Sequence, residues 1–370
     1  MGNGGVLRDA AIAVNGFGFG AAVEKIARLG AGNVNDTFLV QLKGSDGKIV
    51  LQRINARVFP WPVLVMENLR TVSDHVANRM SRDKGLAGRR WEVARIFQSR
   101  DGRDYVVDDQ GGCWRGLAFI DGATAHEKVA DPEQAQEAGR ALGLFHRLLA
   151  DLPPKLLHDT LPGFHSTPGY LLNYDAIAEA AEAHGSATGR FCREFIVRHR
   201  HRATVLEDAA INNVLPMRIM HGDPKISNIL FDDVTGRAIS LIDLDTVKPG
   251  LIHYDIGDCL RSCCNPFGEE TGDGDQVYFD VDLARMILTG YLEEAGPIFT
   301  NSERAYLYDA VFLLAFELGL RFYTDYLAGN VYFKPDYPGQ NLARALVQFT
   351  LAVSIGKQEE DFRKMIAELP

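Results

Sequence analysis

The sequence has few of the residues that mark a secreted or membrane protein. Its 370 residues include only five cysteines: Cys113, Cys192, Cys259, Cys263 and Cys264. An odd, scattered set of cysteines in a long chain does not fit a disulfide framework. A zinc site at Cys259, Cys263 and Cys264 is not expected either, because no second Cys or His pair at zinc spacing accompanies them. No apolar run reaches the ~18 residues that cross a bilayer, and the start, MGNGGVLRD, lacks the apolar core of a signal peptide. We therefore expect a cytoplasmic protein that is not bound to a membrane.

Net positive charge is also missing, since the formal net charge is -10. Binding to nucleic-acid phosphates requires a basic footprint, so nucleic acid is excluded as the main partner. The one basic run, 198–202, has no stacking aromatics nearby and is typical of a solvated helix face. With 46% hydrophobic and 24% charged residues, the composition is that of an ordinary globular protein. The length fits two domains or one two-lobed enzyme.

The residue pattern changes near residue 120. Before it, the stretch TFLVQL-KGSDGK-IVLQRI indicates strand, turn and strand, and further short strands follow a helical stretch over 61–80. From Asp131 onwards, apolar residues recur at three-to-four spacing, which predicts helices. The exception is 216–246, where two short strand-like runs occur. We predict an α+β protein with a mainly β domain over 1–120 and a mainly helical domain over 121–370.

The stretch HGDPKISNILFD, 221–232, followed by SLIDLDT, carries the strongest functional signal. Asp223 can take the proton of a substrate hydroxyl, and Lys225 can neutralise charge on a transferring phosphoryl group. Asn228 and Asp243 offer the hard oxygen ligands that Mg²⁺ prefers. The spacing Asp-x-Lys-x-x-Asn is that of a kinase catalytic loop. A polar turn with capping Asp and Asn is the alternative, but the second Asp after a hairpin favours a phosphotransferase.

A glycine-containing loop lies between two predicted strands in LGAGNVNDTFLV, 29–40. Gly30 and Gly32 would let backbone N–H groups approach the phosphates of ATP. Taken alone, Gly-Ala-Gly is more often a simple hairpin. No GxxxxGK[ST] motif is present, which excludes a P-loop enzyme.

The motif HGDPKISNILFD…LIDLDT resembles the aminoglycoside phosphotransferase and choline kinase superfamily. More narrowly, the chain looks like the N-acetylhexosamine 1-kinases. This likeness rests on GAGNVNDTFLV, VLQRIN followed by VFP, IDLDTVKPG, DIGDCLR and GLRFYTDYLAGNVYF, which run from near residue 30 to past 340.

The resemblance implies a two-lobed protein-kinase-like fold, with a small β-rich N-lobe, a larger helical C-lobe, and ATP and Mg²⁺ in the cleft. It implies Asp223 as the catalytic base and Asn228 and Asp243 as the metal ligands. It also implies that Asp255 holds the catalytic loop through hydrogen bonds to backbone. A simple helix N-cap at Asp255 is an equally good interpretation of the sequence.

Two positions depart from the expected pattern. Kinase-like folds usually place a lysine on the third strand to hold the α- and β-phosphates, but here that strand contains Gln52 and Arg53. Because side chains alternate along a strand, only one of these two can face the nucleotide. The relatives carry histidine in the glycine loop where this chain has Asn33, which is expected to face the substrate.

Evidence for the substrate comes from the apolar helical stretch 309–327, which contains Glu317 and Arg321. The resemblance places Arg321 at the sugar site. The alternative is a structural Glu317–Arg321 pair, because the two residues are four apart and share a helix face.

Three functions are open from the sequence. The first is ATP- and Mg²⁺-dependent phosphorylation of a sugar, at the anomeric hydroxyl of an N-acetylhexosamine. The second is a kinase for a cationic small molecule such as an aminoglycoside or an amino alcohol, which the acidic loop 267–275 would attract. The third is a nucleotide-binding pseudokinase, which only the missing strand lysine supports.

Overall fold

The computed structural model describes residues 3–30, 34–44, 47–83, 86, 88–180, 186–270 and 276–369. They form two compact units. The N-terminal unit comprises 1–123 together with 152–162 and 242–248, and the C-terminal unit comprises 124–151, 163–241 and 249–370. The sequence placed a single boundary near residue 120, whereas two later segments also belong to the N-terminal unit.

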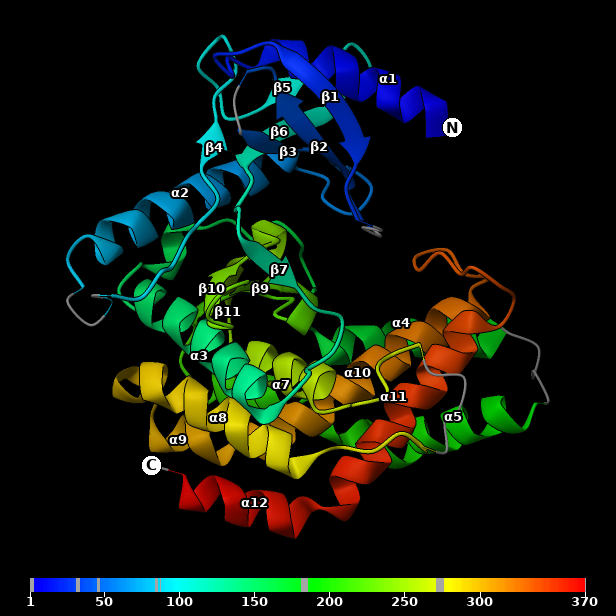
Figure 1. Ribbon diagram of the computed structural model, residues 1–370. Helices are drawn as coiled ribbons and strands as arrows, with labels where there is room; N and C mark the ends of the chain where they lie inside the picture. Colours follow the sequence, from blue (N-terminus) through cyan, green and yellow to red (C-terminus); the bar gives the residue numbers. More distant parts are fainter. Residues whose placement is uncertain are drawn as a thin grey trace. The chain divides into compact units, whose positions relative to one another are not determined.

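The N-terminal unit is built on an antiparallel sheet with strand order β1-β2-β3-β6-β4, in which β5 also pairs with β6 (Figure 1). The strands are β1 (Val23–Arg28), β2 (Asp36–Leu42), β3 (Lys48–Ile54), β4 (Ile96–Phe97), β5 (Val106–Val107) and β6 (Cys113–Ala118). Helix α2 (Pro62–Met80) lies between β3 and β4 in the chain and starts with proline at its first position, where no hydrogen bond is lost.

A short helix, α1 (Asn3–Ala13), covers one face of this sheet (Figure 1). Its Val6 and Ala10 belong to one buried cluster with Phe38, Leu51 and Trp114 of the strands. Because strand side chains alternate, the odd-numbered residues of β3 face α1 and the even-numbered ones face the opposite side. This alternation decides where neighbouring polar residues of β3 point.

The C-terminal unit is mainly helical (Figure 1). Its helices are α3 (Pro132–Leu149), α4 (Thr167–Ala180), α5 (Ala187–His199), α6 (Val205–Ile211), α7 (Ile252–Cys263), α8 (Val281–Ala295), α9 (Asn301–Ala305), α10 (Leu307–Leu327), α11 (Gln340–Lys357) and α12 (Glu359–Glu368). The short strands β9 (Ile229–Asp232) and β10 (Ala238–Leu241) form a hairpin that also pairs with β7 (Ala123–Ala125), and β8 (Arg218–Met220) pairs with β11 (Lys248–Gly250). The apolar helix α10 is buried along most of its length.

Helices α3 and α8 approach each other backbone to backbone. A Cβ atom added at Gly139 would lie 1.8 Å from the carbonyl oxygen of Ile287, and one added at Gly290 would lie 2.0 Å from that of Gln136. Only glycine fits at such a distance. The close approach also fixes the distance between helices α3 and α8, and therefore the distance between the larger side chains that face each other elsewhere along them.

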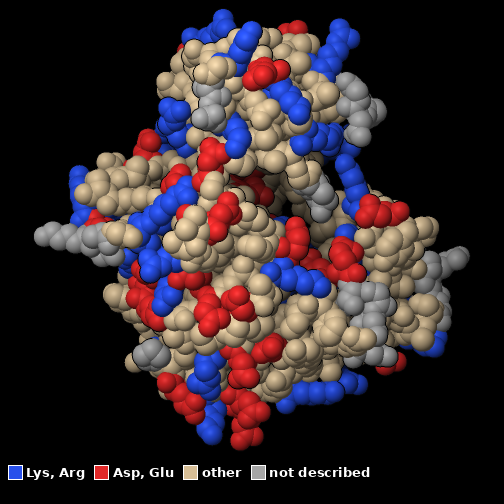
Figure 2. All heavy atoms as spheres, in the orientation of Figure 1, with Lys and Arg blue, Asp and Glu red and all other residues tan. Residues whose placement is uncertain are grey.

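Acidic and basic side chains are interspersed on the face of the molecule that Figure 2 shows. In the described part of the chain, no helix combines the length and the apolar composition required to cross a bilayer.

The contact between α3 and α8 predicts that Gly290→Ala destabilises the protein. The added methyl group would overlap the Gln136 carbonyl, and we expect the free energy of unfolding to fall by about 2–3 kcal/mol, as for overpacked sites. Urea denaturation followed by circular dichroism measures the change. Gly296→Ala is the matched control, because its Cβ meets no atom within 4 Å; equal losses in the two variants would contradict the explanation.

Candidate active site

The predicted catalytic loop, residues 221–228 and called the catalytic loop below, connects β8 to β9 and is held in place by Asp255. The carboxylate of Asp255 accepts hydrogen bonds from the backbone N–H groups of His221 (2.6 Å) and Gly222 (2.7 Å). Asp255 is completely buried and lies inside the first turn of α7, whose N-cap is Leu251. The predicted bonding to the loop backbone is therefore confirmed, and the alternative of an N-cap is wrong.

A buried chain of polar groups extends from Asp255 to helix α8. Nε2 of His146 lies 2.8 Å from the Asp255 carboxylate, and Nδ1 of His146 lies 2.9 Å from the hydroxyl of Tyr291. Burial acts to raise the pKa of Asp255, but the His146 contact and the N–H of Gly222 outweigh it and hold that pKa below its usual range. Asp255 is thus ionised and can accept both loop N–H groups. Sequence reasoning missed His146 and Tyr291.

Asp223, Lys225 and Asn228 come together in the loop, as predicted. The amide nitrogen of Asn228 donates to the Asp223 carbonyl oxygen (2.7 Å) and to Asp223 Oδ2 (3.2 Å). Nζ of Lys225 lies 2.9 Å from Asp223 Oδ2. The Asp223 side chain is 32% exposed, so a substrate hydroxyl can reach it. A carboxylate with a cation beside it suits a base that works next to a transferring anionic group.

The residues expected to hold Mg²⁺ have suitable donor atoms. Because the amide nitrogen of Asn228 is engaged with Asp223, its Oδ1 atom is the one presented as an oxygen ligand. Asp243 carries an exposed carboxylate and belongs to the N-terminal unit. Among the described residues, no group of three or more His, Cys, Asp and Glu side chains is arranged so that it could hold a metal ion by itself. Mg²⁺ bound together with ATP needs only one or two such groups, since phosphates supply further oxygens.

The backbone of Asp243 adopts the left-handed conformation, with φ 64° and ψ 57°. This conformation costs a residue other than glycine about 1 kcal/mol and persists only where the surroundings hold it. Two residues later, the buried Asp245 is bound from three sides. Its carboxylate pairs with Arg115 of β6 and accepts a hydrogen bond from Asn35 (2.7 Å), and its carbonyl accepts one from Thr160 (3.2 Å).

The Arg115–Asp245 pair is almost inaccessible, with side chains 2% and 4% exposed. It fixes the segment that follows Asp243 against the sheet of the N-terminal unit. The sequence analysis did not identify either residue. The second acidic residue of LIDLDT, Asp245, could have indicated this pair. A carboxylate in a buried segment next to a proposed ligand requires a partner.

The two candidates for phosphate binding on β3 point to opposite faces. Gln52 lies on the face away from α1, where its amide donates to Thr37 (3.1 Å) and its Oε1 accepts from Nε of Arg115 (2.9 Å). It is also directly opposite Arg115 in the strand register. The guanidinium of Arg115 therefore lies beside Gln52, at the position of β3 where kinase-like folds usually carry a lysine.

Arg53 lies on the face that α1 covers. Its guanidinium is bound to Asp36 (2.7 Å), lies 3.6 Å from Asp9 of α1, and sits over the ring of Trp114. These contacts tie α1 to the sheet. Of the two candidates, only Gln52 lies on the face that α1 leaves uncovered; its contact with the phosphates stays a prediction.

Of the predicted glycine-loop residues, the structure describes only Gly30, whose φ of 69° is in the region that favours glycine. Gly32 and Asn33 lie outside the described residues. Their roles toward the nucleotide and the substrate stay predictions.

Arg321 lies among aromatic rings in the C-terminal unit. Its guanidinium carbon is 5.3 Å from the ring centre of Phe164, 5.1 Å from Tyr170, 5.9 Å from Tyr332 and 5.4 Å from Phe333. We call these five residues the Arg321 cage. The arginine is only partly buried, and within the described ranges no carboxylate forms an ion pair with it. Its N–H donors suit a ligand that offers oxygen atoms.

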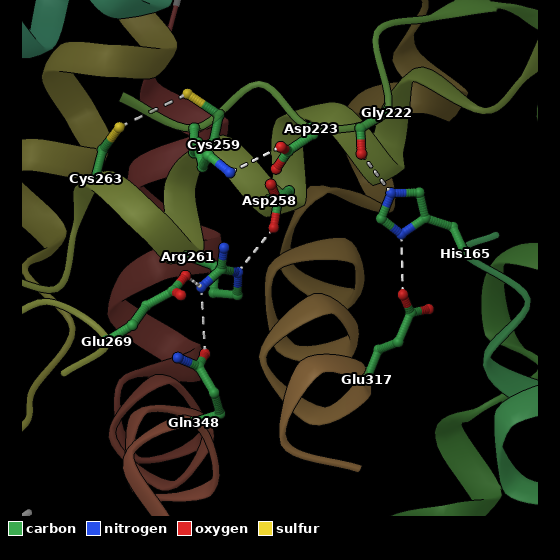
Figure 3. A network of polar contacts seen from close by, with 11 residues as sticks. His165, Gly222, Asp223, Asp258, Cys259, Arg261, Cys263, Glu269, Glu317 and Gln348 are labelled. Carbon is green, nitrogen blue, oxygen red and sulfur yellow. Dashed lines mark hydrogen bonds and ion pairs between the residues drawn. The ribbon is translucent and has the colours of Figure 1, made fainter. Parts of the chain in front are cut away.

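Glu317 does not pair with Arg321, so that alternative is wrong. Its carboxylate lies 2.9 Å from Nδ1 of His165 and accepts a hydrogen bond from Thr167 (2.6 Å). The other ring nitrogen of His165, Nε2, lies 2.8 Å from the carbonyl oxygen of Gly222 in the catalytic loop. Figure 3 shows the His165 ring between these two partners. His165 was not foreseen, because no local pattern marks it.

The acidic loop that could attract a cation is partly engaged. Glu269 lies 2.6 Å from the guanidinium of Arg261, which Asp258 also binds (Figure 3), and Glu270 binds Arg344. Residues 271–275 lie outside the described residues. The two described acidic residues at 269–270 are thus neutralised by arginines.

Comparison with known proteins shows the family and the fold of the chain. The model of the phosphotransferase enzyme family matches residues 25–288. An aminoglycoside phosphotransferase from Alicyclobacillus acidocaldarius has a similar structure, with a TM-score of 0.63 and 16% identity over 97% of this chain and 96% of that one. So does a microcompartment-associated aminopropanol kinase, with a TM-score of 0.65 and 16% identity over 97% and 98%.

A spectinomycin phosphotransferase, solved in complex with ADP and spectinomycin, is similar as well, with a TM-score of 0.57 and 10% identity over 97% and 99%. These likenesses confirm the predicted α+β, kinase-like fold. The family match covers more than half of the sequence and includes the whole catalytic loop. The chain therefore belongs to the phosphotransferase enzyme family and is a small-molecule kinase.

Proposed function

We propose that this kinase transfers the γ-phosphoryl group of ATP to a sugar, at the anomeric hydroxyl of an N-acetylhexosamine. The observation that carries the proposal is the Arg321 cage, in which a guanidinium with no ion-pair partner among the described carboxylates stands among partly exposed aromatic rings. Sugar hydroxyl and acetamido oxygens accept hydrogen bonds from a guanidinium, and aromatic rings offer apolar surface to a sugar ring. The sequence resemblance to N-acetylhexosamine 1-kinases supports the same acceptor.

In the proposed reaction, Asp223 accepts the proton of the acceptor hydroxyl as its oxygen attacks the γ-phosphorus of ATP and ADP leaves. Lys225 offsets the negative charge that develops on the phosphoryl oxygens. Asn228 and Asp243 are the residues that would hold Mg²⁺, which supplies positive charge to the phosphates when bound. Gly30 and Gln52 serve the nucleotide, and Asn33 and Arg321 serve the acceptor.

A cationic acceptor is the alternative, and two observations weigh against it. A guanidinium without an acidic partner repels an ammonium group nearby, and the carboxylates at 269–270 are bound to Arg261 and Arg344. Likeness to aminoglycoside and aminopropanol kinases concerns the fold alone. A pseudokinase is disfavoured because Asp223, Asn228 and Asp243 are all present.

The deciding experiment measures ADP release from purified protein with ATP and Mg²⁺ across a panel of acceptors. The panel contains N-acetylhexosamines, simple hexoses, aminoglycosides, choline and aminopropanol. We expect turnover with an N-acetylhexosamine and loss of the reducing end in the product, as required when the anomeric oxygen is phosphorylated. Turnover with cationic acceptors alone would overturn the sugar assignment.

Replacement of the proposed base, Asp223→Asn, is expected to lower kcat by about 10²–10⁴-fold, the usual contribution of a general base. The fold should remain intact, because the amide keeps the size of the side chain. Initial rates and a thermal melt measure both properties. Asp175→Asn is the matched control, since the side chain of Asp175 is partly exposed and also pairs with a cation, Arg200; a comparable fall in its kcat would contradict the assignment.

Arg321→Met is expected to raise the KM for the acceptor by about 10- to 100-fold, the loss expected for hydrogen bonds from a charged donor. The KM for ATP should stay near its wild-type value. Steady-state kinetics with each substrate varied in turn separates the two constants. Arg363→Met provides the control, because that arginine also sits over a ring, Tyr308, but on the surface. An increase in the KM for ATP alone would contradict the acceptor role.

A further inference from the structure

His165 contacts two groups that can only accept hydrogen bonds. Nδ1 faces the carboxylate of Glu317, and Nε2 faces the carbonyl oxygen of Gly222. A neutral imidazole has one N–H and could satisfy only one of them, so both contacts require the doubly protonated ring. In agreement, the pKa of His165 is raised: burial acts to lower it, but the negative charge of Glu317 prevails.

The backbone at His165 also departs from the usual conformation. Its φ is 62°, in the left-handed region that residues other than glycine seldom occupy. The ring stacks on Tyr254 of α7, with centroids 5.2 Å apart and planes within 9°. A left-handed histidine that is buried, stacked and bonded at both nitrogens is fixed by its surroundings.

His165 contacts the catalytic loop on one side and adjoins the Arg321 cage on the other. On one side, its ring holds the carbonyl of Gly222, the residue directly before Asp223. On the other side, the preceding residue, Phe164, provides one ring of the Arg321 cage. Glu317, which binds His165, lies one helical turn before Arg321 on α10. The same short segment therefore borders the acceptor site and supports the catalytic loop.

We propose that His165 is a positioning residue that couples the Arg321 cage to the catalytic loop, holding the Gly222 carbonyl while it sets Phe164 against the acceptor. This inference rests on the proposed function, because it assigns the cage to the acceptor and Asp223 to the chemistry. It predicts that loss of His165 impairs the rate and acceptor binding together. Binding of ATP alone should be unaffected.

The first test compares His165→Asn with wild type. Asparagine tolerates the left-handed conformation but cannot reach both partners. We expect kcat to fall about 10- to 100-fold, the size of effect that small misplacements of catalytic groups produce, and the KM for the acceptor to rise. His253→Asn is the matched control, because His253 is also buried and contacts a backbone carbonyl, that of Glu303, at 2.8 Å.

The second test uses the pH dependence of kcat. Since the folded-state pKa of His165 is raised above the ordinary value near 6.5, the charged ring and its stabilisation are fully present below about that pH and are lost as the pH rises through the raised pKa. We expect kcat to decline over that alkaline range. Glu317→Gln removes the main cause of the shift and should move the decline to lower pH.

Other ionisable groups around His165 require a control of their own. Asp258 and Tyr254 of α7 face it, and Glu207 lies against Tyr254. Burial raises the pKa of Glu207 to about 7, so its titration could mimic that of His165. Glu207→Gln should leave the alkaline decline in place. If the decline disappears in this variant, the pH dependence belongs to Glu207 and the inference fails.

Long-range ¹H–¹⁵N NMR of protein labelled at histidine gives a readout independent of activity. The signals that vanish in His165→Asn identify His165, and we expect both of its nitrogens to be protonated at neutral pH. A neutral ring would overturn the inference, as would a His165→Asn variant with wild-type kcat and KM. Absence of turnover with every sugar, by contrast, would overturn the proposed function, while the NMR result would still decide the state of His165.

Discussion

The catalytic loop depends on one buried carboxylate. Its first residues belong to no helix or sheet that could pair their N–H groups, and buried backbone donors without partners are costly. Asp255 accepts two of these donors and is itself kept ionised by His146. The orientation of Asp223 follows, because the backbone immediately before it is held at fixed points.

A buried carboxylate also holds a backbone segment in the N-terminal unit. Asp245 binds Arg115 and Asn35 from two strands and thereby fixes the segment that begins with Asp243 in its left-handed conformation. In both places a carboxylate that takes no part in the chemistry holds the backbone next to a residue that is proposed to do so. His165 extends this pattern with the opposite charge, donating to a loop carbonyl where the carboxylates accept from N–H groups.

The sequence was sufficient for the parts of the site that depend on local spacing. Asp223, Lys225 and Asn228 lie within one loop, so their proximity followed from the motif, and the family match confirmed the kinase fold. Apart from the bonds of Asp255 to the loop, which the resemblance implied, contacts between distant segments were not predictable. Spacing on a helix suggested a Glu317–Arg321 pair, yet Glu317 binds His165, 152 positions away in the chain. The orientation of Gln52 and Arg53 depended on α1, whose packing on the sheet no local pattern of β3 reveals.

The two glycines between α3 and α8 have a consequence for how such an enzyme can change over time. Because these helices meet through backbone atoms, the spacing between His146 and Tyr291 is set by main chain and not by side-chain volume. Exchanges of apolar residues in the surrounding core can therefore accumulate without moving the support of Asp255. A change among the partly exposed rings around Arg321, by contrast, would reach the catalytic loop through Phe164 and His165, so the proposed acceptor site and the loop are expected to change together.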